Sequence, residues 1–98
     1  MAFQVTSIID GNTFTVSPRW KWKNIKGDIV KASGYEIPAG GKPGHKNSKG
    51  RLSTLVLGKT VVLKKVEECK YGCLFCNVYV EGKNLTSFFT EFKNNPVG

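Results

Sequence analysis

The sequence predicts a mainly β domain of the α+β class: a five-stranded OB-fold barrel with one short helix between strands 3 and 4 and a short C-terminal helix. Five short segments rich in β-branched and aromatic residues are separated by glycine-containing or polar turns. One segment with helical spacing of apolar residues lies between the third and the fourth of them. A chain of 98 residues has room for one domain, expected at residues 1–93 with a flexible tail at 94–98.

The first half of the chain is predicted to hold three strands and a loop. Phe3 and Val5 supply apolar bulk to the first strand, and Asp10-Gly11-Asn12 is typical of a tight hairpin turn. In order, we expect strands at residues 3–9, 13–16 and 28–35, with a long basic connection at 17–27 after the second strand and a loop at 38–47 after the third.

The second half is predicted to hold the helix, two more strands and a closing helix. In order, we expect a helix at residues 48–57, a strand at 60–66, a turn at 69–72, a strand at 73–80, a turn at 81–82 and a short helix at 85–92. Gly58 is the residue expected to end the first helix. Lys49 and Arg51 oppose the helix dipole in its first turn, so its stability is expected to come from packing.

The composition favours a polyanion as partner. The formal charge is +8, and a small domain this basic attracts nucleic acid or another polyanion. No stretch is long and apolar enough to span a bilayer, and the N-terminal residues lack the basic and apolar regions of a signal peptide. We therefore expect a cytoplasmic protein with no membrane partner.

Four motifs occur in the order, and at about the spacing, of a known family. They are Ile8-Ile9-Asp10-Gly11-Asn12-Thr13 in the first hairpin, Glu36-Ile37-Pro38-Ala39 after the third strand, residues 52–63 across the helix and the next strand, and Lys70-Tyr71-Gly72 before the fifth strand. Together they resemble the staphylococcal nuclease (thermonuclease) family over nearly the whole chain. The resemblance implies an OB-fold barrel whose active members hydrolyse phosphodiesters with the help of calcium.

The resemblance also carries the family's site onto this chain, where several groups are changed. Asn12 stands at a calcium-binding aspartate, and Glu36 stands at a second metal ligand, so the metal site is depleted in charge. Lys31 replaces a phosphate-binding arginine and keeps its charge without the bidentate fork. Ala39 stands at the general base and Cys73 at the second arginine, and neither supplies the required chemistry.

Loss of catalysis with retained phosphate binding is the resulting expectation. Removing a general base costs roughly 10²–10⁴-fold and removing an electrostatic stabiliser roughly 10²–10³-fold. Glu36 and Lys31 are what remains of the catalytic set. Lys70 and Tyr71 match family residues beside the bound phosphate, so with Lys31 they are expected to hold a phosphate; the alternative is that they simply form a good turn.

Two further basic segments are candidate nucleic-acid contacts. Trp20 lies within Arg19-Trp20-Lys21-Trp22-Lys23, where it either stacks on bases or covers the barrel. Lys42, Lys46 and Arg51 crowd the glycine-rich loop and the helix start, where they either contact phosphates or form a solvated surface.

Three cysteines and one histidine raise the question of a zinc site. Cys73 and Cys76 point to opposite faces of the predicted strand, which argues against joint chelation. Cys76 is expected to be a buried thiol. Cys69 and Cys73 are left open between free thiols, a disulfide across the turn and a metal site that includes His45.

Three functions are consistent with these residues. The first is a catalytically inactive, nuclease-like domain that binds nucleic acid, preferably single-stranded, or nucleotide through a basic cleft. The second is a divergent phosphodiesterase that uses Glu36, Asp10 and Asn12 around a metal, with calcium as the expected ion. The third is a protein-interaction module.

Overall fold

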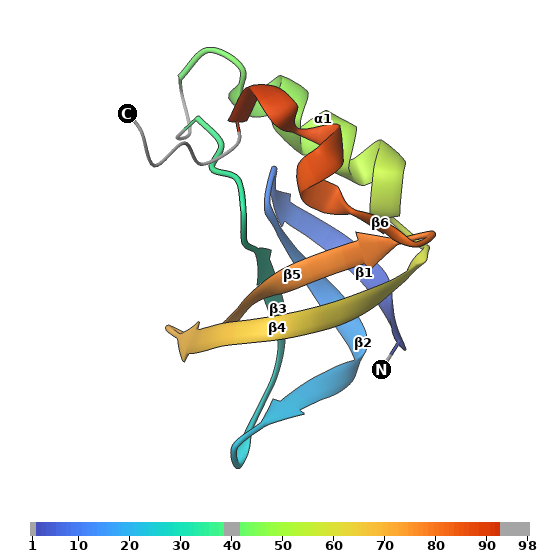
Figure 1. Cartoon of the computed structure of the whole chain (residues 1–98), viewed down its shortest axis with the longest axis vertical. Coiled ribbons are helices and arrows are strands. Elements are labelled where there is room, and N and C mark those ends of the chain that lie inside the picture. The colour runs from blue at the N-terminus through green and yellow to red at the C-terminus, as the bar shows by residue number, and fades with distance from the viewer. Residues whose placement is uncertain (1, 39–41, 93–98) are drawn as a thin grey trace.

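The computed structural model describes residues 2–38 and 42–92, which form the predicted barrel with its helix (Figure 1). The elements are, in order, β1 (Ala2–Asp10), β2 (Thr13–Trp22), β3 (Ile25–Ala32), α1 (His45–Val56), β4 (Thr60–Lys70), β5 (Cys73–Val80), the two-residue β6 (Lys83–Asn84) and the 3-10 turns η1 (Leu85–Phe88) and η2 (Thr90–Phe92). The closing helix predicted at 85–92 therefore takes the form of two 3-10 turns.

Five strands close into a mixed barrel. β1 pairs antiparallel with β2 and β4, β2 with β3, and β4 with β5. A parallel pairing between β3 and β5 closes the barrel, with Val30 opposite Leu74. Strand order β1–β2–β3–β5–β4 and a helix between β3 and β4 match the predicted OB-fold architecture, and β6 adds a short strand beside β5.

The connection predicted at residues 17–27 is wrong, because β2 and β3 continue through it as a hairpin (Figure 1). The pairing of β2 with β3 is irregular between Thr15 and Trp20, a stretch that contains Pro18, which has no N–H to donate. The hairpin turn is made by Lys23 and Asn24, both at positive φ, as a two-residue turn of type I′ requires. Because this irregular stretch interrupts the alternation of apolar and polar residues, the sequence pattern did not indicate a strand here.

Smaller boundary errors have similar local causes. The helix begins at His45, three residues before the predicted start, so the loop ends at Gly44, whose φ of 89° needs glycine. β3 begins at Ile25 and ends at Ala32, so the stretch predicted as its end leaves the sheet. β4 runs to Lys70, which shortens the predicted turn to Tyr71-Gly72, two residues at positive φ.

The core fills the barrel and the space under α1 and η1. Along β5 the alternate residues Leu74, Cys76, Val78 and Val80 are buried, because successive side chains of a strand point to opposite faces. On α1 the buried residues are Ser48, Leu52 and Val56. No helix among the described residues is long and apolar enough to cross a membrane.

Tyr35, just after β3, carries the core toward the C-terminal turns. Its ring stacks on that of Phe89, with centroids 4.5 Å apart, and both side chains are buried. This contact ties the segment after β3 to the 3-10 turns, and it therefore helps to fix one wall of the site described next.

Candidate functional site

A cleft of about 560 Å³ opens between the β1–β2 turn and the segment that follows β3. Asp10 and Asn12 line it from the first hairpin, residues 31–38 form a second wall, and Glu67 and Phe75 contribute from β4 and β5. Four residues predicted for the site, Asp10, Asn12, Lys31 and Glu36, thus line a single cleft.

Asn12 is fixed from both its backbone and its side chain. Its carbonyl oxygen accepts a hydrogen bond from the Ala32 N–H at 2.8 Å, and its Oδ1 accepts one from Thr13 Oγ1 at 3.0 Å. The residue is only 5% exposed. Asn12 therefore offers a neutral oxygen that already has a partner, which is a poor ligand for a hard cation.

Asp10 is drawn toward the start of α1. Its Oδ1 accepts a hydrogen bond from the Gly11 N–H at 3.1 Å, and His45 Nδ1 lies 3.5 Å from the same oxygen. The same Nδ1 lies 3.0 Å from the Pro38 carbonyl oxygen. His45 thus joins the two walls of the cleft through Asp10 and Pro38, a bridging position that the sequence analysis did not foresee.

The charge of the cleft does not match the prediction of a basic cleft. Its lining holds three carboxylates, from Asp10, Glu36 and Glu67, and one cation, Lys31. Among residues 2–38 and 42–92, no three His, Cys, Asp or Glu side chains are grouped closely enough to hold a metal ion. The cleft is therefore acidic on balance, without a cluster of carboxylates.

Lys31 faces an aromatic side chain that the sequence analysis did not assign to the site. Its Nζ lies 5.3 Å from the centroid of the Phe75 ring, within the range of a cation–π interaction. The two residues are direct neighbours across the parallel β3–β5 pairing. The single cation of the cleft is thereby positioned over the outer surface of β5.

Lys70 and Tyr71 do not line this cleft. Tyr71 lies in the β4–β5 turn and is 89% exposed, with Lys70 Nζ 5.4 Å from its ring centroid. The pair forms a solvent-facing cation and aromatic group at the end of the barrel strands. Ala39, the residue at the general-base position, lies outside the described residues, as does the predicted tail at 94–98.

Trp20 is a core residue in this structure. It is 1% exposed, and its Nε1–H donates a 2.8 Å hydrogen bond to the Ile29 carbonyl. No face of the ring is free for a base, so the covering interpretation is correct and base stacking on Trp20 is not. Trp22 is half-buried, with Lys23 Nζ 4.6 Å from the centroid of its ring.

The cations around the helix start differ in their surroundings. Arg51 donates hydrogen bonds to both carboxylate oxygens of Glu91 at 2.8 and 2.7 Å, and another to the Phe88 carbonyl at 3.0 Å. Because its guanidinium is occupied in this way, Arg51 is a structural residue rather than a free phosphate ligand. Lys42 and Lys46 are exposed and line a pocket of about 260 Å³ at the start of α1.

The three cysteines are free thiols in the structure. Cys73 lies opposite Lys70, whereas Cys69 lies opposite Leu74, so the two residues belong to different faces of the hairpin. That arrangement disfavours a disulfide across the turn and a shared metal. Cys76 is fully buried, as predicted, and burial raises the pKa of its thiol to about 12.

A second surface overlaps the cleft at Lys31 and Phe75, and its residues on β5 were not predicted as a site. Phe75, Asn77 and Tyr79 alternate on the outside of β5 and are half-buried. Lys64 lies opposite Asn77 on β4, with its Nζ 5.0 Å from the Tyr79 ring centroid. We call Lys31, Lys64, Phe75, Asn77 and Tyr79 the β5 outer face.

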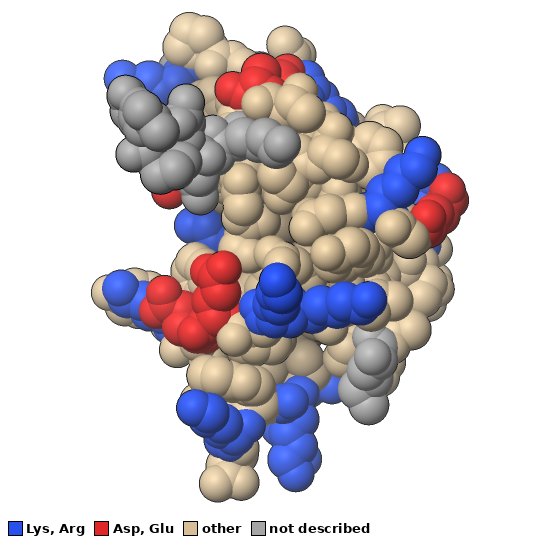
Figure 2. All heavy atoms as spheres, in the orientation of Figure 1, with Lys and Arg blue, Asp and Glu red and all other residues tan. Residues whose placement is uncertain are grey.

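Charges gather unevenly over this side of the molecule. Figure 2 shows lysine and arginine side chains over the middle of β4 and around the β2–β3 hairpin, with acidic side chains beside the end of β4 that leads into β5. The exposed cations of the hairpin are Arg19, Lys21, Lys23 and Lys26. Positive charge thus lies on two sides of the β5 outer face, whereas the exposed Glu68, opposite Phe75 on β4, brings negative charge to one end of it.

Comparison with protein-family models and with curated proteins yields no match to this chain. The side chains of the cleft and of the β5 outer face are therefore the basis from which a function is inferred.

Proposed function

We propose that this barrel is a domain related to staphylococcal nuclease that binds single-stranded nucleic acid and does not hydrolyse it. The observation that carries the proposal is the repeated cation and aromatic pairing along β5, with Lys31 5.3 Å from the Phe75 ring centroid and Lys64 5.0 Å from that of Tyr79. Aromatic rings beside cations are how barrels of this type hold single strands, because bases stack on the rings while cations meet the phosphates.

The geometry of β5 fits a strand of nucleic acid laid along it. Phe75 and Tyr79 are four residues apart on one face, which corresponds to roughly 13 Å along an extended strand. Asn77 lies between them, and its Oδ1 accepts a hydrogen bond from Ser33 Oγ at 2.8 Å, which leaves the amide N–H₂ as a donor. Two stacking surfaces with a polar group between them would accommodate successive nucleotides.

Hydrolysis is not expected, because the groups that it needs are changed. Asn12 brings no charge and is already hydrogen-bonded, and the cleft has one cation where phosphoryl chemistry needs a clamp. The acidic balance of the cleft also repels phosphate. A strand is therefore expected to follow the β5 outer face from the edge of the cleft at Lys31 and Phe75 toward Lys64 and Tyr79, with the two lysines as its contacts.

An oligonucleotide titration with a cleavage readout tests the proposal. Fluorescein-labelled single-stranded DNA and RNA are titrated at low and high salt, with and without calcium, and the samples are then run on a denaturing gel. We expect the protein to bind both the single-stranded DNA and the single-stranded RNA without cleaving either. The logarithm of the association constant should fall by about 0.7 per phosphate contact for each tenfold rise in salt.

Substitutions on the β5 outer face separate this surface from general attraction by the net charge of +8. Phe75→Leu and Tyr79→Leu should each weaken binding by roughly 5- to 150-fold, the equivalent of about 1–3 kcal/mol per stacked base. Lys31→Ala should reduce the salt dependence, whereas Lys83→Ala, an equal loss of charge at the exposed first residue of β6, should change it less. Equal effects of both lysine substitutions would contradict a localised surface.

A phosphodiesterase is the second candidate, and one observation favours it. Glu67 lines the same cleft as Lys31 and Glu36, and it supplies a carboxylate that the family resemblance did not lead us to expect there. A carboxylate near a lysine is able to activate water beside a bound phosphate. Cleavage in the titration that is lost in both Glu36→Ala and Glu67→Gln would establish this function in place of binding alone.

A further inference from the structure

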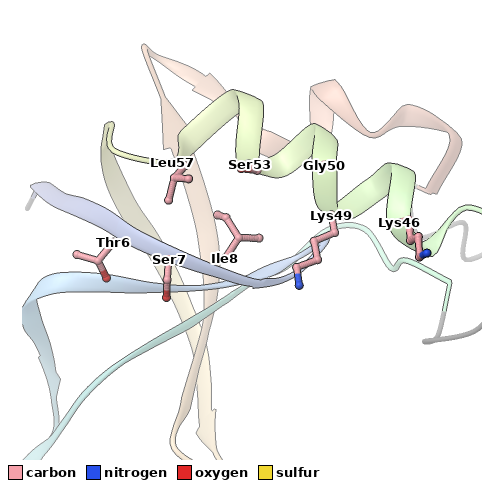
Figure 3. Close-up of a pocket in the computed structure, with 8 residues that line it drawn as sticks. All are labelled: Thr6, Ser7, Ile8, Lys46, Lys49, Gly50, Ser53 and Leu57. Atoms are coloured by element: carbon pink, nitrogen blue, oxygen red, sulfur yellow. The ribbon is translucent and has the colours of Figure 1, made fainter.

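A groove of about 550 Å³ runs between β1 and α1 (Figure 3), and it shares no lining residue with the cleft or the β5 outer face. Its lining residues are Thr6, Ser7 and Ile8 from β1, Lys46, Lys49, Gly50 and Ser53 from α1, and Leu57 at the end of the helix. Ile8 and Leu57 point toward the space between the two elements (Figure 3), and Leu57 is 46% exposed. The groove therefore has an apolar floor that the described residues leave open.

One side of the groove is a strand edge without a partner strand. β1 pairs with β4 only from Ala2 to Gln4, and Val5 exchanges backbone hydrogen bonds with Gly58 and Lys59. Beyond Val5, the only strand that pairs with β1 in the described chain is β2. The second edge of β1 is thus open along the groove.

The side chains at this edge leave the main chain accessible. Thr6 Oγ1 and Ser7 Oγ each lie 2.6 Å from Thr15 Oγ1 on β2, and both side chains point away from α1 (Figure 3). Because both residues line the groove, their main chain rather than their side chains borders it. An extended peptide is the ligand that satisfies an open strand edge, since it supplies the missing donors and acceptors in register.

The opposite wall is shaped for close approach. Gly50 lies in the interior of α1, where glycine is less favourable than alanine. A Cβ at this position would meet nothing within 4 Å, so packing inside the domain does not explain the glycine. A helix wall without a side chain at this point allows another backbone to come near.

The positive charge of the groove favours a negatively charged ligand. Lys46 and Lys49 are exposed, and neither has a carboxylate within 4.0 Å among the described residues. A second copy of this chain is disfavoured because each copy carries a charge of +8. A nucleic acid is disfavoured because no aromatic side chain lines the groove to stack on a base.

We infer that this groove binds an extended, acidic segment of a partner protein by strand addition to β1. The segment pairs with the open edge at Thr6–Ser7–Ile8, places an aliphatic side chain on Ile8 and Leu57, and passes Gly50 closely. Its carboxylates meet Lys46 and Lys49. The site is separate from the proposed nucleic-acid surface, so either function is able to fail without the other.

A display selection provides the test. A phage library of random peptides about a dozen residues long, enough to span the groove when extended, is selected against the intact protein. We expect enrichment of peptides that alternate aliphatic and acidic residues. With an enriched peptide bound, amide chemical-shift changes in ¹⁵N-labelled protein should concentrate at residues 6–8 and 46–57.

Two pairs of variants distinguish the groove from general charge attraction. Gly50→Leu should weaken the enriched peptide at least about tenfold, whereas Thr54→Leu, an exposed helix position outside the groove lining, should leave its affinity unchanged. The double variant Lys46→Glu with Lys49→Glu should abolish binding, whereas Lys21→Glu with Lys26→Glu on the β2–β3 hairpin should have a small effect. Thermal unfolding of each variant checks that it is folded.

Several results would overturn the inference. These are the absence of enrichment, equal losses from the two lysine pairs, and shift changes confined to β5. If an oligonucleotide binds at Lys46 and Lys49 and displaces the peptide, the groove is a nucleic-acid site instead.

Discussion

The hydroxyl of Tyr35 donates a hydrogen bond of 3.1 Å to the carbonyl oxygen of Gly11, in the turn between β1 and β2. Asn12, which follows Gly11 in the chain, and Glu36, which follows Tyr35, line the same cleft. Burial raises the pKa of Tyr35 far above its ordinary value, so the hydroxyl stays protonated and remains a donor at physiological pH. One buried bond thus connects the two walls of the cleft.

Removing this bond is expected to destabilise the fold. Tyr35→Phe keeps the stacking on Phe89 but leaves the Gly11 carbonyl without its partner, at a cost of about 1–3 kcal/mol. Urea unfolding measures the loss. Tyr71→Phe, at a side chain that is 89% exposed, is the matched control and should stay within about 0.5 kcal/mol of the wild type. Equal stability of the wild type and Tyr35→Phe would mean that the bond contributes nothing.

Two glycines should respond in opposite directions to the same substitution. A Cβ at Gly27 would lie 2.6 Å from the Trp20 ring, so Gly27→Ala should displace this core side chain and cost about 1–3 kcal/mol. Gly50 has open space around its Cβ position, so Gly50→Ala should stabilise the helix by up to about 1 kcal/mol. Thermal unfolding with tryptophan fluorescence measures both variants, and a destabilised Gly50→Ala would contradict the proposed open wall.

The success of the fold prediction came from local signals that agree with the tertiary structure. The turn at residues 10–12, the alternation along β5 and the helix before Gly58 each follow from neighbouring residues. The β2–β3 hairpin was missed because its local signals depart from the usual strand and turn patterns. Pro18 interrupts the alternation, and Lys23-Asn24 forms the turn without the glycine that usually indicates a two-residue hairpin turn.

Prediction of the candidate site was limited in the same way. The motif order pointed to Asp10, Asn12, Lys31 and Glu36, and the structure brings these four into one cleft. Glu67 and Phe75 were not assigned to it, because only barrel closure carries β4 and β5 to the end of β3. The charge of a cleft is the sum over all its walls, so the acidic balance was not visible in any single motif.

Acid should weaken the contact between α1 and the C-terminal turns. Hydrogen bonding to Arg51 lowers the pKa of Glu91 from 4.5 to about 2. The folded state therefore gains stability from this carboxylate above pH 4.5, and loses that gain as the pH falls toward 2. The difference in urea midpoint between the wild type and Glu91→Gln should be present at pH 7 and shrink toward pH 2.

The exposure of this pair sets its salt dependence and its control. The side chains of Arg51 and Glu91 are 35% and 52% exposed, so about 1 M salt should reduce the same difference. Glu81→Gln removes a more exposed partner of Lys59 at 3.9 Å and should show a smaller difference at every pH. A pH-independent gap for Glu91→Gln would indicate that packing, rather than the ion pair, holds η2 in place.

Alkali should destabilise the barrel through Cys76. Burial, with a smaller contribution from the charge of Glu67, raises the pKa of its thiol from 9.0 to about 12. Between these values the unfolded chain releases the proton while the folded chain keeps it, so the free energy of unfolding falls as the pH rises, by at most about 1.4 kcal/mol per pH unit. Urea unfolding from pH 8 to 11 should show this decline, and the decline should be shallower in Cys76→Ala.

Tyr35 contributes a second decline of the same sign above its ordinary pKa of 10.0. Cys76→Ala should therefore still lose stability at the alkaline end, and the double variant Tyr35→Phe with Cys76→Ala should show a smaller decline still. An identical decline of the unfolding free energy with pH in the wild type and Cys76→Ala would show that the buried thiol does not cause the loss of stability in alkali.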